Sequence, residues 1–119
     1  MDWDLGDGIM TLISYETGDA SMYLSSGGAV IGGGQHENVS NASKAFVSKA
    51  QGYLDKAVKT DTTILSDKNC VKFYFLTNKG KFVAQETMNN IENNSSKWLD
   101  FFEEGNKVIS ELRLTTEKK

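Results

Sequence analysis

The sequence predicts an α+β domain with a mostly antiparallel sheet of five or six strands and two helices, built from two ββ(β)α repeats. The first observation is an internal similarity at an offset of 52 residues, which aligns Gly28 with Gly80 and Phe46 with Trp98. The second is a change of period in each half, from short β-branched runs to apolar residues at every third or fourth position. With 119 residues, of which 39% are hydrophobic, the chain suits a single domain over residues 1–119.

The first repeat unit, residues 8–59, begins with a predicted hairpin. Its strands are expected at 9–15 and 20–25, because both runs are rich in β-forming residues and a glycine-containing turn separates them. A third short strand is expected at 29–31, after a second glycine turn. Residues 1–7 are interpreted as an acidic arm that docks on the edge of the domain.

The remainder of the first unit is predicted to be an amphipathic helix over 38–59, capped near Asn38. Lysines lie off its apolar stripe, so one side of the helix faces the core and the other faces solvent. The stripe consists of Val39, Ala42, Phe46, Ala50, Tyr53 and Ala57.

The second unit, residues 60–114, is predicted to repeat this order. Strands are expected at 62–65, 71–77 and 81–86, with a glycine turn between the last two. The absence of proline throughout the chain means that Gly, Asn, Asp and Ser must form the turns.

The final helix is predicted over 95–114, since large apolar residues recur there at helical spacing despite Gly105. It carries the heavier apolar face of the two helices, and we expect it to pack closely on the sheet. The tail, residues 115–119, is expected to fray.

Composition excludes several classes of protein. The formal net charge of −3 and the pI near 5.1 provide no overall basic field, so nucleic acid is not an expected partner. A lone cysteine, Cys70, has no partner for an internal disulfide, which indicates a reducing compartment. The acidic N-terminus does not resemble a signal peptide and no stretch is long enough to span a membrane, so we expect a cytoplasmic protein that does not bind membranes.

The segment 27–36 is the one candidate ligand site. Its exposed backbone amides are of the type that binds phosphate or another anion, although the spacing matches neither the dinucleotide fingerprint nor a phosphate-binding loop. A flexible connector is the competing interpretation. The candidate ligand-binding residues are Ser26, Gly32, Gly33, Gly34 and His36.

No catalytic residue, metal site or cofactor is predicted. His36 is the only histidine, and among residues at metal-ligand spacing it has only Glu37. The adjacent carboxylates Glu103 and Glu104 point about 100° apart on a helix and do not converge on a substrate.

An interaction surface is predicted from the strand at 71–77, because both of its faces are apolar. One face should meet the helices, and the other needs cover from a second copy of the protein or from the N-terminal arm. We therefore expect a homodimer or a complex with an unidentified protein. The candidate interface residues are Phe73, Phe75 and Phe82, with Lys44 and Lys49 on the basic side of the first helix.

The stretch 22–31, with its glycine turn, and the following helix with its small residues resemble roadblock and longin-type modules, and more remotely profilin-like sheets. The small residues are Ala42, Ala45, Ala50 and Ala57. The resemblance rests mainly on the order of elements and covers residues 8–114. It implies a dimerising scaffold without enzymatic activity, of the kind that serves small GTPases, motors or trafficking complexes.

The leading hypothesis is thus a non-enzymatic protein-interaction or regulatory module that is dimeric. One alternative is a small-ligand or anion-binding domain, or an enzyme, that uses residues 27–36. Another alternative is an inhibitor or immunity-type protein that binds a second protein, which the sequence does not distinguish from the leading hypothesis.

Overall fold

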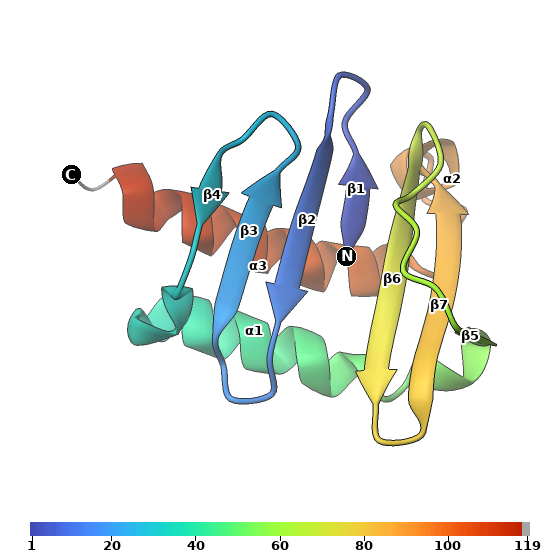
Figure 1. Cartoon of the computed structure of the whole chain (residues 1–119), viewed down its shortest axis with the longest axis horizontal. Coiled ribbons are helices and arrows are strands. Elements are labelled where there is room, and N and C mark those ends of the chain that lie inside the picture. The colour runs from blue at the N-terminus through green and yellow to red at the C-terminus, as the bar shows by residue number, and fades with distance from the viewer. Residues whose placement is uncertain (118–119) are drawn as a thin grey trace.

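An antiparallel sheet backed by helices forms the molecule (Figure 1). The computed structural model describes the backbone of residues 1–117 and the side chains through Thr115. In this part of the chain the sheet has seven strands in the order β4-β3-β2-β1-β6-β7-β5. The strands are β1 (Asp2–Asp4), β2 (Ile9–Ser14), β3 (Ala20–Leu24), β4 (Ala29–Val30), β5 (Val58–Thr60), β6 (Cys70–Thr77) and β7 (Gly80–Thr87).

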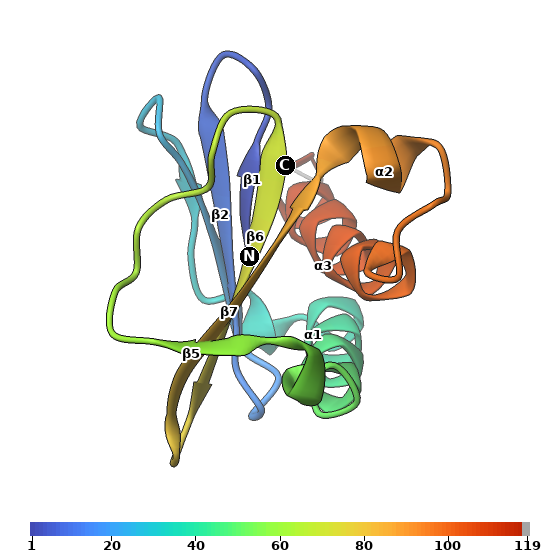
Figure 2. The same ribbon diagram turned by 90° about the vertical axis from the view of Figure 1, so that its right-hand side faces the viewer.

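Within residues 1–117, helices cover only one face of this sheet (Figure 2). The described helices are η1 (Gly33–Gln35), α1 (Glu37–Ala50), η2 (Leu54–Lys56), α2 (Met88–Glu92) and α3 (Leu99–Glu117). Figure 2 shows α1 and α3 on one side of the sheet, and the connection between β5 and β6 on the other side. The α+β class is therefore confirmed, although the sheet is larger than the expected five or six strands.

Strand β1 corrects the prediction for residues 1–7. Instead of an arm at the edge, Asp2–Asp4 lies in the middle of the sheet and pairs with both β2 and β6. The Trp3 side chain faces the helices, with its ring edge-on to Phe102 at 5.0 Å between centroids. On the other face the Asp2 carboxylate accepts a hydrogen bond from the Thr11 hydroxyl at 2.8 Å. Partial burial of the Trp3 ring and hydrogen bonds to the acidic side chains allow this polar segment to occupy a central position.

The backbone of Met1 extends the same pairing. Its α-amino group donates to the Leu12 carbonyl at 2.7 Å, and the Leu12 amide donates to the Met1 carbonyl at 2.8 Å. Burial lowers the pKa of this amino group from 8.0 to about 6, despite the opposing charge of Asp2.

The predicted hairpins are present. β2 pairs with β3, and β6 pairs with β7 in a register that places Phe75 opposite Phe82. Gly80 begins β7 with φ of 121°, a conformation that L side chains rarely adopt. The glycine turn therefore has the role that the sequence indicated.

The region between the two hairpins differs from the prediction. α1 ends at Ala50 rather than continuing to residue 59, and residues 62–65 form no strand. After the Gln51–Gly52 turn, the Tyr53 ring packs 5.3 Å from the Trp98 ring, and β5 pairs with β7. Glycine is a poor helix former, and these tertiary contacts stabilise the alternative path.

The two halves are consequently not equivalent units. The 52-residue offset places β3 and β4 on β6 and β7, but it places β2 on residues 61–66, which are not a strand. The edge strand of the first half, β4, is the last strand of that half along the sequence. The edge strand of the second half, β5, is the first strand of its half along the sequence. The similarity therefore reflects one hairpin shared by both halves, not a duplicated domain.

The last helix begins later than predicted. α2 is a separate short helix, in which the Thr87 hydroxyl accepts from the Asn90 amide at 3.3 Å. Before α3, the Ser96 hydroxyl accepts from the Trp98 amide at 3.0 Å, and the helix proper starts at Leu99. α3 continues through residues 115–117 of the expected frayed tail, and residues 118–119 lie outside the described part.

An aromatic cluster fills the space between the sheet and the helices. The Phe101 ring stacks on Phe46 of α1 at 4.7 Å and on Phe75 of β6 at 5.6 Å. Phe73 stacks on Trp98 at 5.4 Å. This cluster ties α1, α3 and β6 into one core, as the apolar periodicity of both helices predicted.

Candidate functional site

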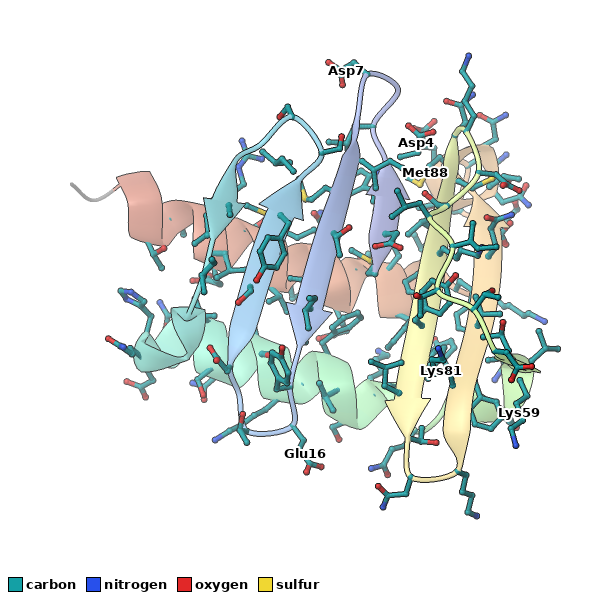
Figure 3. All side chains as sticks on the ribbon, in the orientation of Figure 1. Asp4, Asp7, Glu16, Lys59, Lys81 and Met88 are labelled. Carbon is teal, nitrogen blue, oxygen red and sulfur yellow. The ribbon has the colours of Figure 1, made fainter. Side chains whose placement is uncertain are left out.

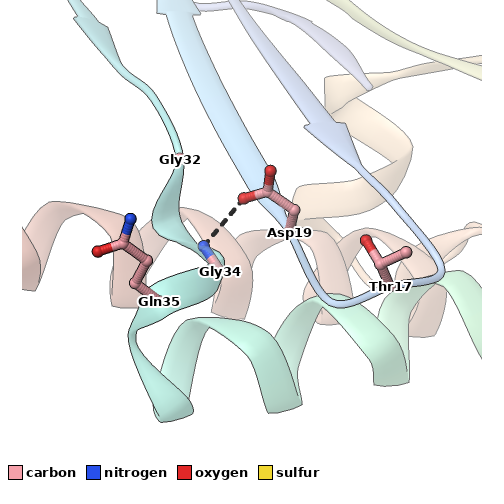
Figure 4. Close-up of a pocket in the computed structure, with 5 residues that line it drawn as sticks. All are labelled: Thr17, Asp19, Gly32, Gly34 and Gln35. Atoms are coloured by element: carbon pink, nitrogen blue, oxygen red, sulfur yellow. Dashed lines mark hydrogen bonds between the residues drawn. The ribbon is translucent and has the colours of Figure 1, made fainter.

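The glycine-rich loop is held by the protein's own carboxylate. Asp19, directly before β3, accepts a hydrogen bond through Oδ1 from the Gly34 backbone amide at 2.9 Å (Figure 4). The same oxygen accepts from the Ala20 backbone amide at 2.9 Å. The Ser43 hydroxyl of α1 donates to the Asp19 carbonyl at 2.9 Å. The amide of Gly34, which an external anion would need, is therefore already engaged.

Close packing explains two of the glycines in this loop. A β-carbon on Gly33 would lie 2.4 Å from Leu112 Cδ2, and one on Gly34 would lie 2.9 Å from the Asp19 Cα. Such approaches require a shift of the neighbouring atoms. The glycines let the loop pass tightly between the start of β3 and the end of α3.

The surface beside the loop is a shallow, open depression of about 300 Å³. Gly32 and Gly34 border it, together with Thr17, Asp19 and Gln35 (Figure 4). Most ligand sites are enclosed and largely apolar, with a few convergent polar groups. This depression lacks enclosure.

The predicted ligand-binding residues do not converge. Ser26 lies in the turn between β3 and β4, at the opposite end of β4 from the loop (Figure 1). Gly33 is buried, whereas His36 is exposed. His36 borders a second depression, which lies between the start of α1 and the last turns of α3. Among the described residues, no group of three His, Cys, Asp or Glu side chains is arranged to hold a metal ion.

The predicted interface phenylalanines point into the core. Phe73 and Phe75 are 2% and 6% exposed, and the helices cover them. Phe82 is partly buried on the same face, opposite Phe75. The proposal that Phe73 and Phe75 contact a partner is therefore corrected, because the pleat of β6 turns them toward α3.

The two predicted lysines lie on α1, behind the sheet. Lys44 is exposed, whereas Lys49 is half-buried and lies 4.0 Å from Glu104 of α3. Lys49 thus helps to join the helices.

The sheet face away from the helices forms the other large surface, which we call the open face. Residues alternate between the two faces of a strand, so Tyr74 and Leu76 of β6 point to the open face when Phe73 and Phe75 point to the core. The same alternation places Thr11 and Tyr23 on this face in the left half of the view in Figure 1.

The connection between β5 and β6, residues 61–69, crosses the open face of β6 and β7 as a strap (Figures 1 and 2). The Tyr74 hydroxyl donates to the Ile64 carbonyl. Gln85 of β7 donates to the Asp67 carboxylate at 3.0 Å and accepts from the Asp67 amide at 3.1 Å. The Asn69 amide donates to Asp4 of β1 at 3.0 Å. Side chains of three strands therefore hold the strap on the sheet.

Exposed apolar side chains gather around the strap. Leu76 is 72% exposed, and Val58 of β5 is 67% exposed in register with Val83. On the strap itself, Ile64 and Leu65 are 64% and 51% exposed. Scattered apolar residues are ordinary on protein surfaces, but several on adjacent elements of one face are typical of an interaction site.

Charge divides unevenly across the sheet. Residues 1–43, which include β1 to β4, contain six acidic residues and no lysine or arginine. Residues 44–81 contain eight lysines and three acidic residues, and three of these lysines, Lys44, Lys49 and Lys56, lie on α1 and η2 and not on the sheet. Within residues 1–117 no ion pair joins Lys72, Lys79 or Lys81 to a carboxylate.

The surroundings of Cys70, the cysteine at the start of β6, disfavour its reactive thiolate form. Burial raises the pKa of the Cys70 thiol, and the negative charges of Asp67, Asp4 and Glu86 raise it further. A thiol that stays protonated is a weak nucleophile.

Comparison with known proteins gives no further identification: no family model, no curated protein and no solved structure matches this chain. In addition, no helix within residues 1–117 has the length and apolar character needed to cross a membrane.

Sequence reasoning missed most residues of the open-face surface. Val58 was assigned to a helix, and residues 62–65 were assigned to a strand that forms the strap instead. The alternation in 71–77 did indicate part of this surface, because it placed Leu76 on the other face of the strand from the core-facing phenylalanines.

Proposed function

We propose that this domain is a non-enzymatic protein-interaction module that binds its partner through the open face of the sheet. The observation that carries the proposal is the group of exposed apolar side chains around the strap, Val58, Ile64, Leu65 and Leu76. Lys72, Lys79 and Lys81 lie near this group and form no ion pair within residues 1–117, which gives the mixture of apolar contact and charge steering found in protein interfaces.

The glycine-rich loop favours this function over the anion-binding alternative. Asp19 occupies the Gly34 amide, and a carboxylate beside the loop repels a second anion. The predicted polar helpers Ser26 and His36 lie at opposite ends of β4. We therefore assign the loop a packing role.

The relation to roadblock and longin-type modules stays a prediction, and so do the homodimer and the inhibitor or immunity-type role. All three share the proposed feature, which is a binding surface for another protein. They differ in the identity of that protein.

Site-specific photo-crosslinking tests the proposal. A photoreactive phenylalanine analogue replaces Leu76 on the open face, and the matched control carries it in place of Ser48, which is exposed on α1. We expect position 76 to give a discrete crosslinked product in cells that express the protein, with the second protein identified by mass spectrometry. The product should be lost when Lys81→Glu is added. Equal products at positions 76 and 48, or no product at 76, contradict the proposal.

A further inference from the structure

We propose that the open face binds the open face of a second copy of this chain, with the acidic half of each sheet lying over the basic half of the other. This inference rests on the proposed function, because it names the occupant of the same surface. It is carried by charge, by shape and by the geometry of a two-fold axis.

Charge complementarity is the first argument. Asp4 of β1 lies on the open face, and Asp7 and Glu16 lie in the exposed turns at either end of β2 (Figure 3). In the other half, Lys72 and Lys81 point to the open face, opposite Gln85 and Leu76. Opposite charges on two halves of one surface make that surface complementary to itself.

The direction of the two-fold axis follows from this division. An axis parallel to the strands, along the boundary between β1 and β6, places the left half of one sheet over the right half of the other. An in-plane axis perpendicular to the strands places like charges over each other, which is unfavourable. Only the strand-parallel axis satisfies the charges.

The same axis preserves position along the strands. Glu16, in the turn after β2, lies at the same end of the sheet as Lys81, near the start of β7 (Figure 3). Asp7, in the turn before β2, lies at the opposite end of the sheet (Figure 3). The turn that contains Lys68 lies at this end too, because it immediately precedes β6. In the dimer Glu16 therefore faces the partner's Lys81, and Asp7 faces the partner's Lys68.

Shape gives an independent argument. The strap raises the β6–β7 half of the open face, whereas no segment of the described chain crosses the β2–β3 half (Figures 1 and 2). In the two-fold arrangement each strap lies on the uncovered strands of the other copy. Ile64 and Leu65 then contact Tyr23, which is 38% exposed on that half.

The short edge strands also favour face-to-face association. The edge strands β4 and β5 have only two and three residues, so they offer short templates for strand addition. Aligned packing of two sheets is a common way to cover such a face.

Sedimentation velocity of the purified chain tests the proposal. We expect a dimer at low ionic strength whose dissociation constant rises at least about tenfold between about 0.05 M and about 0.5 M salt, because salt screens exposed charges. Glu16→Lys and Lys81→Glu should each weaken the dimer at least about tenfold. The double variant should recover the affinity, since each contact occurs twice in an isologous dimer.

Two controls keep the result interpretable. Lys97→Glu changes an exposed lysine next to the helices and should leave the dimer unchanged. Circular dichroism reports folding, and if Lys81→Glu fails to fold, Lys79→Glu in the exposed turn replaces it.

The outcomes separate this inference from the proposed function. A chain that stays monomeric at low salt, a dimer indifferent to both charge reversals, or a double variant without recovery overturns the self-association. If position 76 nevertheless crosslinks to a different protein, the interaction function stands and only the occupant is wrong. If the chain is monomeric and position 76 captures nothing, both proposals fail.

Discussion

Single residues decide how closely the elements of this domain approach one another. Gly33 is buried where η1 passes the end of α3, and Gly105 lies where α3 passes Met1 and Phe46. A β-carbon on Gly105 would lie 3.0 Å from both Met1 Sδ and Phe46 Cζ. The glycine that weakens the helical pattern of α3 therefore marks a close crossing of the helix with its neighbours.

Replacement of Gly33 should be costly because its surroundings are core. We expect Gly33→Ala to lower the free energy of unfolding by about 1–3 kcal/mol, since the new methyl group overlaps Leu112 and Val39. Gly52→Ala is the matched control, because its β-carbon would meet only the Lys49 carbonyl at an ordinary 3.5 Å. That change should stay within about 0.5 kcal/mol. Urea denaturation measures both, and equal effects would contradict the role of packing.

Glu86 at the end of β7 organises the chain before α3. Its carboxylate accepts from the Thr87 amide at 2.8 Å, from the Asn90 side chain at 2.9 Å and from the Ser96 hydroxyl at 2.6 Å. Burial alone raises the pKa of Glu86, but the hydrogen bonds to its ionised form outweigh burial and leave the pKa below its ordinary value of 4.5.

This shift predicts a pH-dependent contribution to stability. A lowered folded pKa means that the stabilisation is fully present above about pH 4.5 and disappears as the pH falls through the folded value. We expect Glu86→Gln to cost about 1 kcal/mol at pH 7 and progressively less in acid. The control is Glu92→Gln, at an exposed position of α2. Urea midpoints measured from pH 7 to pH 3 should converge for Glu86→Gln; a constant difference rules out the mechanism.

At the scale of elements, β6 has two faces with different tasks. Phe75 packs on Phe101 and Trp98, whereas its neighbour Leu76 is 72% exposed on the open face. Alternation along the strand separates the core from the proposed interface within a single residue step.

Neighbouring aspartate substitutions should reveal this division. We expect Phe75→Asp to cost more than about 3 kcal/mol, because it removes a core ring and buries a charge. Leu76→Asp should change stability by less than about 0.5 kcal/mol and should reduce association instead. Thermal unfolding together with sedimentation separates the effects. Similar stability losses in both variants would place the core on the wrong side of β6.

The elements that were predicted correctly are those whose signals are local. Alternation and glycine turns identified both hairpins, and the 3.6-residue period identified the bodies of α1 and α3. Residues 62–65 of the strap were predicted to be a strand because they are β-branched or apolar. The actual path of the strap depends on hydrogen bonds to Tyr74, Gln85 and Asp4, which lie in other parts of the sequence. No short window of sequence contains those partners.

The candidate site was predictable only in part for the same reason. The sequence indicated that strand 71–77 has two apolar faces, but it did not indicate which face the helices cover. The glycine-rich loop was predicted to bind an anion because its backbone amides have no partner in the neighbouring sequence. The actual partner of the Gly34 amide, Asp19, lies 15 residues away. Tertiary contacts thus decided both assignments.

At the scale of the whole molecule, the N-terminal strand joins the two halves of the sheet. β1 lies between β2 and β6, and in the described chain these two strands pair with β1 but not with each other. Segments more than 60 residues apart in sequence meet there. Helices α1 and α3 add the second connection, through the aromatic cluster behind the sheet.

Removal of β1 should therefore cost the protein its cooperative fold. We expect a chain that starts at Gly6 to lose near-ultraviolet circular dichroism and its sigmoidal urea transition. The deletion removes backbone pairing on both sides of β1 and the Trp3 contact with Phe102, against a total stability of only about 5–15 kcal/mol for a typical domain. A synthetic peptide of residues 1–7 added to this chain should restore the signals, because the gap between β2 and β6 accepts a strand. The same peptide with Trp3→Asp should not restore them, since it buries a charge where the ring belongs. An unchanged urea midpoint in the shortened chain, or equal rescue by both peptides, means that β1 does not hold the halves together.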